Sequence, residues 1–404
     1  MKRLFLIGIG TFIVAVVIVM RGSVLERIDI ETRHHVIAVI SRFNAPSVIT
    51  ADEIQVTPIV HNPVGVNTFL EQEVDVELRR RTVEMIRDAG IGWMRQQFPW
   101  DNIEPVEKGR YIDRVVGVDT WEKYDAIVAL AEEMGPRLII RLDTSPPWAR
   151  PGNAWPATPP DDLADYGDFV EGVARRYRGR VQHYQIWNEP NLTSEWGNKP
   201  VNASEYVELL KLAHSRIKRA DPDALVLSAA LAPTIEESTS AQNELKYLDE
   251  MYRLGAAPYF DILSVQAYGL RSGPDDRRLE DDDVNFSRSL LIRELMVRHH
   301  DARKPIWAAE VGWNAQPSSL TKPAIFGRVS EELQSRYTVR ALERARQEWP
   351  WMGVMAVWFF KRADYNWIDE PMYYFRMAEP DLTPRALYFS IQEYTRQRGL
   401  TSAR

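Results

Sequence analysis

Most of this sequence alternates two kinds of segment, and the alternation constrains the fold more than any other feature. From Pro63 onward, short apolar runs rich in β-branched residues are each followed by an amphipathic window of helical period. Strands are predicted at 65–67, 91–95, 137–142, 181–187, 225–228, 260–266, 305–310 and 353–359. Helices are predicted to follow them near 75–89, 120–134, 161–178, 203–220, 240–254, 285–299, 328–348 and 384–397.

Eight such units of about 42 residues predict a (β/α)8 barrel with long loops over residues 63–404. An open, doubly wound sheet is the structural alternative. That fold normally has a glycine-rich turn after its first strand, and the segment GVNTFLEQE at 65–73 is not such a turn. The alternation leaves no sequence for a second domain.

The amino-terminal segment has the properties of a membrane anchor. Residues 4–20 form an uncharged apolar run of 17 positions, flanked by Lys2, Arg3 and Arg21. As a helix the run would be about 26 Å long, just under the hydrocarbon thickness of a bilayer. Because no small-x-small cleavage site follows, an uncleaved single-pass anchor at 1–22 is favoured over a cleaved signal peptide. Positive charges on both sides leave its orientation open.

Residues 23–62 are predicted to form a stalk between the anchor and the barrel. Apolar residues recur there at helical intervals, which indicates an amphipathic helix near the membrane or a tether that packs on the barrel. Three further apolar residues suggest a short strand. The helical set is Leu25, Ile28, Val36, Val39, Ile40 and Phe43, and the strand set is Ile54, Val56 and Ile59.

Composition excludes several classes of function. The formal net charge is −7 and no block of basic residues occurs, which argues against a nucleic-acid partner. Cysteine is absent, so disulfides, cysteine-zinc sites and thiolate nucleophiles are excluded. The adjacent pairs His34–His35 and His299–His300 lack the spacing of zinc ligands, and the acidic run at 280–283 lacks that of a calcium loop. No metal or cofactor is therefore expected.

Two glutamates stand at the carboxyl ends of predicted strands, where barrels of this type carry their chemistry. Glu189 lies in YQIWNEPNL (184–192) at the end of the fourth strand, and Glu310 lies in PIWAAEVGW (305–313) at the end of the seventh. Cleavage of a glycosidic bond needs such a pair, with one carboxyl protonated and the other ionised. Burial near tryptophan and hydrogen-bond donors can separate two carboxyls in this way.

The Trp-Asn-Glu-Pro-Asn segment at 187–191, together with the second glutamate, resembles glycoside hydrolase clan A, the retaining glycosidases built on (β/α)8 barrels. It is most similar to family 39 and related cellulase-like enzymes, over about 335 residues. The resemblance implies that Glu189 is the general acid/base and Glu310 the nucleophile. It also implies that Asn188 binds the sugar 2-hydroxyl.

The same resemblance implies roles for residues on other strands. Arg95 would bond the nucleophile and keep it ionised, Tyr268 would touch the same carboxylate, and Trp358 would form the floor of the cleaved subsite. Many clan members have a histidine two residues before that tyrosine, where this chain has Gln266. An amide can donate a hydrogen bond there but cannot titrate.

Aromatic residues near the strand ends are candidates for sugar binding. Flat rings stack on the apolar faces of sugars, although core packing is the alternative for each ring. The tryptophans in or beside the predicted carboxyl-end loops are Trp100, Trp148, Trp155, Trp196, Trp313 and Trp367. Trp148 and Trp313 are the strongest candidates. Asp143, at the end of the third strand, is a candidate subsite residue, with loop capping as the alternative.

These features predict a membrane-tethered retaining β-glycosidase that acts on a polysaccharide or oligosaccharide by double displacement. The catalytic domain is expected outside the cytoplasm, because a polymer cannot cross the membrane; secretion after signal cleavage is the alternative. Two other functions stay open. One is a non-catalytic carbohydrate-binding barrel in a surface-polysaccharide assembly, and the other is a transglycosylase.

Overall fold

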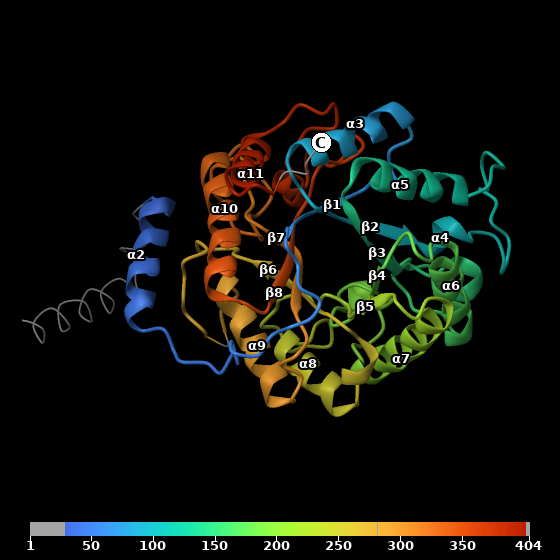
Figure 1. Ribbon diagram of the computed structural model, residues 1–404, viewed down its shortest axis with the longest axis horizontal. Helices are drawn as coiled ribbons and strands as arrows, with labels where there is room; N and C mark the ends of the chain where they lie inside the picture. Colours follow the sequence, from blue (N-terminus) through green and yellow to red (C-terminus); the bar gives the residue numbers. More distant parts are fainter. Residues whose placement is uncertain (1–28, 281, 401–404) are drawn as a thin grey trace, which may run out of the picture.

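The computed structural model describes residues 29–280 and 282–400, and its centre is a parallel eight-stranded sheet curved into a barrel (Figure 1). The sheet order is β5-β4-β3-β2-β1-β8-β7-β6, so the first and last strands are neighbours. Isolated parallel bridges between Leu227 and Ile262 and between Leu231 and Val265 nearly close the barrel between β5 and β6. The strands are β1 (Val64–Thr68), β2 (Trp93–Pro99), β3 (Arg137–Asp143), β4 (His183–Ile186), β5 (Leu225–Leu227), β6 (Leu263–Tyr268), β7 (Ile306–Gly312) and β8 (Met352–Val357).

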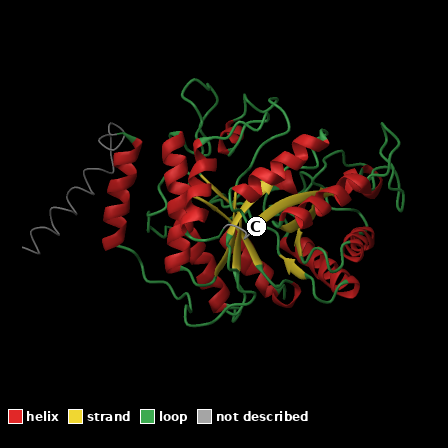
Figure 2. Cartoon of the chain, turned by 45° about the horizontal axis from the view of Figure 1, so that its top comes forward, coloured by secondary structure: helices red, strands yellow, loops and turns green. Residues whose placement is uncertain are grey.

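Helices surround the strands, as the (β/α)8 prediction requires (Figure 2). Every predicted helix after residue 63 has a counterpart whose ends lie within four residues of the prediction. Several begin at a side chain that accepts a hydrogen bond from the first turn, namely Asp75, Asp162, Asn202, Asn243 and Ser330. The helices are α3 (Val76–Asp88), α5 (Trp121–Met134), α6 (Leu163–Arg176), α7 (Ala203–Ala220), α8 (Glu244–Arg253), α9 (Ser289–Arg298), α10 (Glu331–Glu348) and α11 (Ala386–Gln397), with the short α4 (Trp100–Ile103) directly after β2.

The amino end of the barrel is filled by a layer of large side chains. His183 stacks on Trp307 there, and Trp93 packs edge-on against both, with ring centroids about 5 Å apart. Burial lowers the pKa of His183 to about 3, so its ring is neutral. The other members of the layer are Ile139, Leu227, Ile262 and Val354. A plug of this kind leaves the opposite end of the barrel for a binding site.

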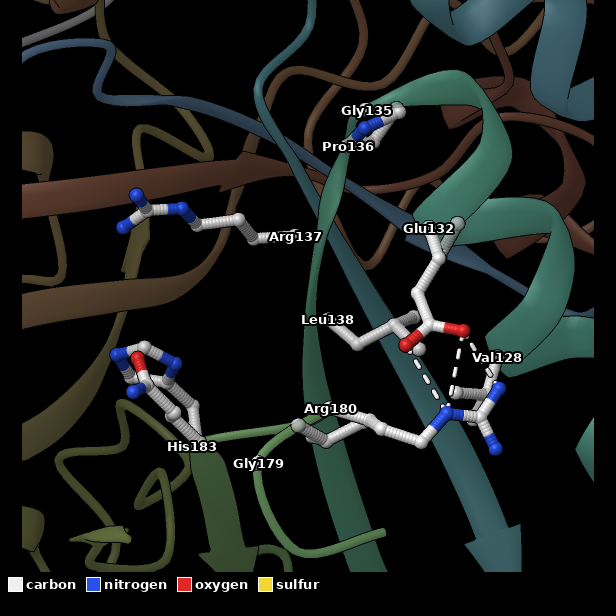
Figure 3. A pocket seen from close by; sticks show the side chains of 12 residues that line it. Val128, Glu132, Gly135, Pro136, Arg137, Leu138, Gly179, Arg180 and His183 are labelled. Carbon is white, nitrogen blue, oxygen red and sulfur yellow. Dashed lines mark hydrogen bonds and ion pairs between the residues drawn. The ribbon is translucent and has the colours of Figure 1, made fainter. Parts of the chain in front are cut away.

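A cavity of about 290 Å³ also lies at the amino end (Figure 3). Arg137 and His183, at the beginnings of β3 and β4, line it, and Glu132 and Arg180 form an ion pair at its side. It is therefore separated by the length of the strands from the glutamates that the sequence singles out.

Two predicted strand assignments differ from the structure. β2 continues to Pro99 rather than ending at Arg95, because each of its residues from Trp93 onward pairs with β3. Arg95 therefore lies inside the strand. The strand suggested around Ile54–Ile59 is absent; Pro58 has no N–H group for a ladder, and Thr57 N bonds only to Arg303 O.

The stalk contains a helix, α2 (Ile30–Phe43), that packs beside α10 on the outside of the barrel (Figure 1). His34 Nδ1 lies 3.1 Å from the Tyr337 hydroxyl, and Glu31 pairs with Arg336. This part of the stalk is thus helical and contacts the barrel through α10. No helix within 29–280 or 282–400 is long and apolar enough to cross a membrane. The predicted anchor at 1–22 lies outside the described residues.

Candidate active site

The segment after β4 has an unusual backbone that is held by its neighbours. Trp187 and Glu189 have φ of 68° and 46°, in the left-handed region that non-glycine residues seldom adopt. Glu189 N donates to Ala230 O at 3.0 Å, and Asn188 forms a parallel bridge with Ala230. Strained residues of this kind persist where the surrounding structure fixes them, often at functional sites.

Glu310, near the end of β7, receives two hydrogen bonds from other strands. Arg95 Nη1 donates to its Oε1 at 2.9 Å, and the Tyr268 hydroxyl donates to its Oε2 at 2.7 Å. The carboxylate is buried, with Glu310 only 4% exposed. Both contacts match the roles that the resemblance implies for Arg95 and Tyr268.

Arg95 is the centre of a larger network. Besides Glu310, its guanidinium donates to Asn67 Oδ1 at 2.7 Å, to Gln185 Oε1 at 2.7 Å and to Asn188 Oδ1 at 2.8 Å. Four acceptors, from β1, β4, β7 and the segment after β4, therefore fix the arginine, and the arginine fixes them. A planar guanidinium with donors in a rigid fork can satisfy such a set.

Glu189 lies in a different environment from Glu310. Its Oε1 accepts a hydrogen bond from Gln266 Nε2, and no Lys, Arg or His in the described part of the chain forms an ion pair with it. Burial raises the pKa of Glu189 to about 7, and the negative charge of Glu310 adds to this effect. One glutamate is thus held by a cation and a hydroxyl, whereas the other favours its protonated form.

Several charged residues near these glutamates were not predicted from the sequence. Arg141 Nε lies 2.8 Å from Asp143 Oδ2, and Gln97 donates to Asp143 Oδ1 at 2.7 Å. Burial, with a contribution from Glu189, raises the pKa of Glu195 to about 8. Strand alternation could have identified Arg141, which is two residues before Asp143, whereas no periodic signal marks Glu195.

Asp101, at the start of the segment after β2, was also missed. Burial, together with the charge of Asp143, raises its pKa to about 6. No sequence motif surrounds it. The neighbouring Trp100, rather than Asp101, was predicted as a candidate for sugar binding.

The predicted aromatic residues differ in how far they are exposed to solvent. Trp358 is half-buried and packs edge-on against Phe69, with centroids 5.6 Å apart. Trp155 and Trp367 are exposed. The rings of Trp100 and Trp196 are buried in the core.

The two strongest tryptophan candidates lie apart from the glutamate network. Trp313 is 1% exposed and donates from Nε1 to Ser272 O at 2.7 Å. Trp148 is half-buried, and its Nε1 donates to Glu104 O at 2.7 Å. The structure thus joins Glu189, Glu310, Asn188, Arg95, Tyr268 and Gln266 around one point, but does not join Trp148 or Trp313 to them by a hydrogen bond.

Fold and site together define a class of protein: a parallel barrel of eight strands whose carboxyl end carries a half-buried glutamate just after β4 and a buried glutamate in β7. Solved structures with this fold include a family 39 glycoside hydrolase from the gut symbiont Bacteroides cellulosilyticus WH2, with a TM-score of 0.63 and 18% identity over 87% of this chain. A GH39 enzyme from Xanthomonas axonopodis pv. citri has a TM-score of 0.55 and 15% identity over 87% of this chain. This chain covers 65% and 67% of those two proteins.

Similarity extends to another glycoside hydrolase family. The structure of a GH5_18 protein from Streptomyces cattleya in complex with Manb1-4GlcNAc has a TM-score of 0.61 and 16% identity to this chain. The match covers 84% of this chain and 82% of the Streptomyces protein chain. No protein-family model and no curated protein matches the sequence. The predicted resemblance to family 39 is confirmed at the level of the fold.

Proposed function

We propose that this protein is a retaining β-glycosidase that hydrolyses O-glycosidic bonds of a polysaccharide or oligosaccharide. Glu310 attacks the anomeric carbon while Glu189 protonates the departing oxygen, and Glu189 then deprotonates the water that hydrolyses the covalent intermediate. The opposite environments of the two glutamates carry this proposal. Arg95 and Tyr268 bind one carboxylate, whereas the pKa of the other is raised to about 7.

Neighbouring side chains have free groups that suit a sugar substrate. Asn188 uses its Oδ1 to accept from Arg95, and its Nδ2 has no acceptor among residues 29–280 and 282–400. That amide can donate to a sugar 2-hydroxyl, a bond that strengthens in the transition state. Trp358 offers a ring beside the same site. The glycoside hydrolases with the same fold support this assignment.

The experiment compares the wild type with Glu189→Ala and Glu310→Ala on aryl β-glycosides and polysaccharides. We expect the wild type to release product with retained configuration and both variants to lose at least about 100-fold in kcat. Azide should rescue Glu310→Ala and give a product of inverted configuration. Sugar binding without turnover in all three proteins would instead indicate a non-catalytic binding barrel, and transfer to an added sugar in place of water would indicate a transglycosylase.

We also propose that residues 1–22 anchor the protein and that its barrel lies outside the cytoplasm. The uncharged run at 4–20 supports the anchor, and a polymeric substrate supports the location. Membrane fractionation of the full chain, followed by extraction with carbonate and with detergent, tests this. Release by carbonate, or a mature amino terminus beyond residue 20, would indicate a peripheral or a secreted protein.

A further inference from the structure

Arg362, five residues after β8, is a buried arginine that forms no ion pair with any described residue. It is 6% exposed, and its guanidinium carbon lies 3.7 Å from the ring centroid of Phe69 and 4.6 Å from that of Trp367. Among residues 29–280 and 282–400, its one polar contact is from Nη2 to Met372 Sδ at 3.9 Å. Within the described ranges, its Nε and Nη1 donate to no acceptor and no carboxylate lies within 4.0 Å of it.

Three other cations at this end of the barrel, all largely inaccessible to solvent, are paired with carboxylates. Lys361, the preceding residue, lies 2.7 Å from Glu73, Arg95 lies 2.9 Å from Glu310, and Arg141 lies 2.8 Å from Asp143. A buried cation without an anion is costly, because desolvation is not offset by attraction. Stacking on aromatic rings offsets part of that cost for Arg362. Its guanidinium therefore remains able to bind an anion.

Arg362 also adjoins the place where a sugar would lie. Phe69 contacts the Arg362 guanidinium and the ring of Trp358, which the resemblance assigns to the floor of the cleaved subsite. Burial lowers the pKa of Arg362 to about 10, while the charges of Glu71, Asp364 and Glu310 oppose that shift, so the group is still cationic at neutral pH. An anion bound there would belong to the substrate.

We propose that the site binds a sugar carrying an anionic group, which receives hydrogen bonds from the Nη1 and Nη2 atoms of Arg362. The planar fork of a guanidinium matches two oxygens of one carboxylate or sulfate. This inference rests on the proposed glycosidase function and adds a substrate class to it. Uronic acids and sulfated sugars both carry an anionic group whose oxygens can accept these hydrogen bonds, and the experiment below distinguishes the two.

The test uses matched pairs of polysaccharides on the full-length protein. Uronate-containing polymers are compared with the same polymers after carboxyl reduction, and sulfated polymers with their desulfated forms. We expect the wild type to cleave one anionic member at least about 10-fold better than its neutral counterpart. In Arg362→Met, the ratio of kcat/KM for the anionic over the neutral member should fall about 10- to 100-fold, as expected for loss of a charge-assisted hydrogen bond.

Two variants separate charge recognition from stability. Arg362→Lys keeps the charge but not the fork, so the ratio should be intermediate. Arg176, on α6, is the matched control: it stacks on Trp121 at 4.7 Å and pairs with Asp125, and Arg176→Met should leave the ratio unchanged. Thermal midpoints of all variants show whether each is folded. An equal ratio in wild type and Arg362→Met, or a wild-type preference for the neutral members, overturns the proposal.

Failure of the glycosidase proposal is detected separately. If no polymer is cleaved, binding of acidic and carboxyl-reduced oligosaccharides to Glu310→Gln is measured by calorimetry, with and without Arg362→Met. Tighter binding of the acidic form that depends on Arg362 supports the anion site, although the hydrolase assignment would fall. Equal binding of both forms overturns the anion site.

Discussion

Glu189 and Glu310 have the same side chain but lie in different surroundings: Arg95 and Tyr268 donate to Glu310, and Gln266 donates to Glu189. The raised pKa of Glu189, about 7, comes from burial and from the charge of Glu310. Because only the protonated form can donate to the leaving oxygen, we expect kcat/KM to fall as the pH rises through about 7. A pH–rate profile on an aryl glycoside measures this limb. With a leaving group that needs no proton, Glu189→Gln should lack the limb, and its persistence would assign it to another residue.

The same shift predicts an effect on stability. The folded-state pKa of Glu189 lies above its ordinary value of 4.5, so folding favours the protonated carboxyl. Its contribution to stability is complete below about pH 4.5 and is lost as the pH rises through about 7. Glu189→Gln mimics the protonated form and should raise the free energy of unfolding at pH 8 by up to about 3 kcal/mol. Chemical denaturation at pH 4 is the control, where the two proteins should agree.

Arg95 is the residue whose replacement should affect both folding and catalysis. Lysine keeps the charge but has a compact ammonium group, which cannot reach acceptors on Asn67, Gln185, Asn188 and Glu310 together. We expect Arg95→Lys to lower the free energy of unfolding by about 2–4 kcal/mol and kcat/KM by at least about 100-fold. Denaturant titration and steady-state kinetics measure these effects. An unchanged kcat would show that the network is structural only.

At the scale of strands and helices, the packed side chains at the amino end of the barrel explain why position 353 has no room for a side chain. A Cβ on Gly353, in β8, would overlap the indole nitrogen of Trp307, which is wedged between Trp93 and His183. Gly353→Ala should therefore destabilise the fold by about 1–3 kcal/mol. Its kcat should remain close to the wild-type value, because the change is at the end of the barrel opposite the glutamates.

A matched glycine in a helix gives the control for that prediction. A Cβ on Gly172, in α6, would meet no atom within 4 Å. Gly172→Ala should stabilise the protein by about 0.5–1 kcal/mol, because alanine has the higher helix propensity. Thermal unfolding of both variants measures the difference. A neutral Gly353→Ala would mean that Trp307 can move aside, and that the amino-end layer is not tightly packed.

The hydrophobic period of the sequence predicted the helices and strands, but not which side chains at the ends of the strands face the candidate active site. Trp313 follows the predicted seventh strand and Trp358 lies near the end of the predicted eighth, and both were predicted to bind sugar. β7 ends at Gly312, and Trp313 follows it directly. The Trp313 ring is buried and donates a hydrogen bond to Ser272 O. That outcome depends on Gly269, whose missing Cβ leaves room for the Trp313 ring. Such a long-range fit leaves no local pattern in the sequence.

At the scale of the whole molecule, parallel topology explains why a glutamate pair was predictable. The carboxyl ends of β4 and β7 lie at one end of the barrel, so residues 121 positions apart act at one site. The unpaired state of Arg362 was not predictable, because it depends on where Glu73, Asp143 and every other acidic side chain comes to lie. Likewise, an amphipathic pattern in α2 suits a lipid surface or a protein surface equally, and only the contacts with α10 decide between them.

The docking of α2 should depend on pH through His34. Burial lowers the pKa of His34 from its ordinary value of 6.5, and its Nδ1 is 3.1 Å from the Tyr337 hydroxyl. A released helix binds the proton more readily than the docked one, so the contribution of His34 to docking is complete above about pH 6.5 and is lost as the pH falls below it. We expect amide exchange in Ile30–Phe43, corrected for intrinsic rates, to be faster at pH 5.5 than at pH 7.5 relative to α6. His34→Gln keeps a polar group near Tyr337 without a titrating ring, and should remove this difference. If the difference persists in His34→Gln, His34 is not its source, and the ion pair of Glu31 with Arg336 becomes the contact to test.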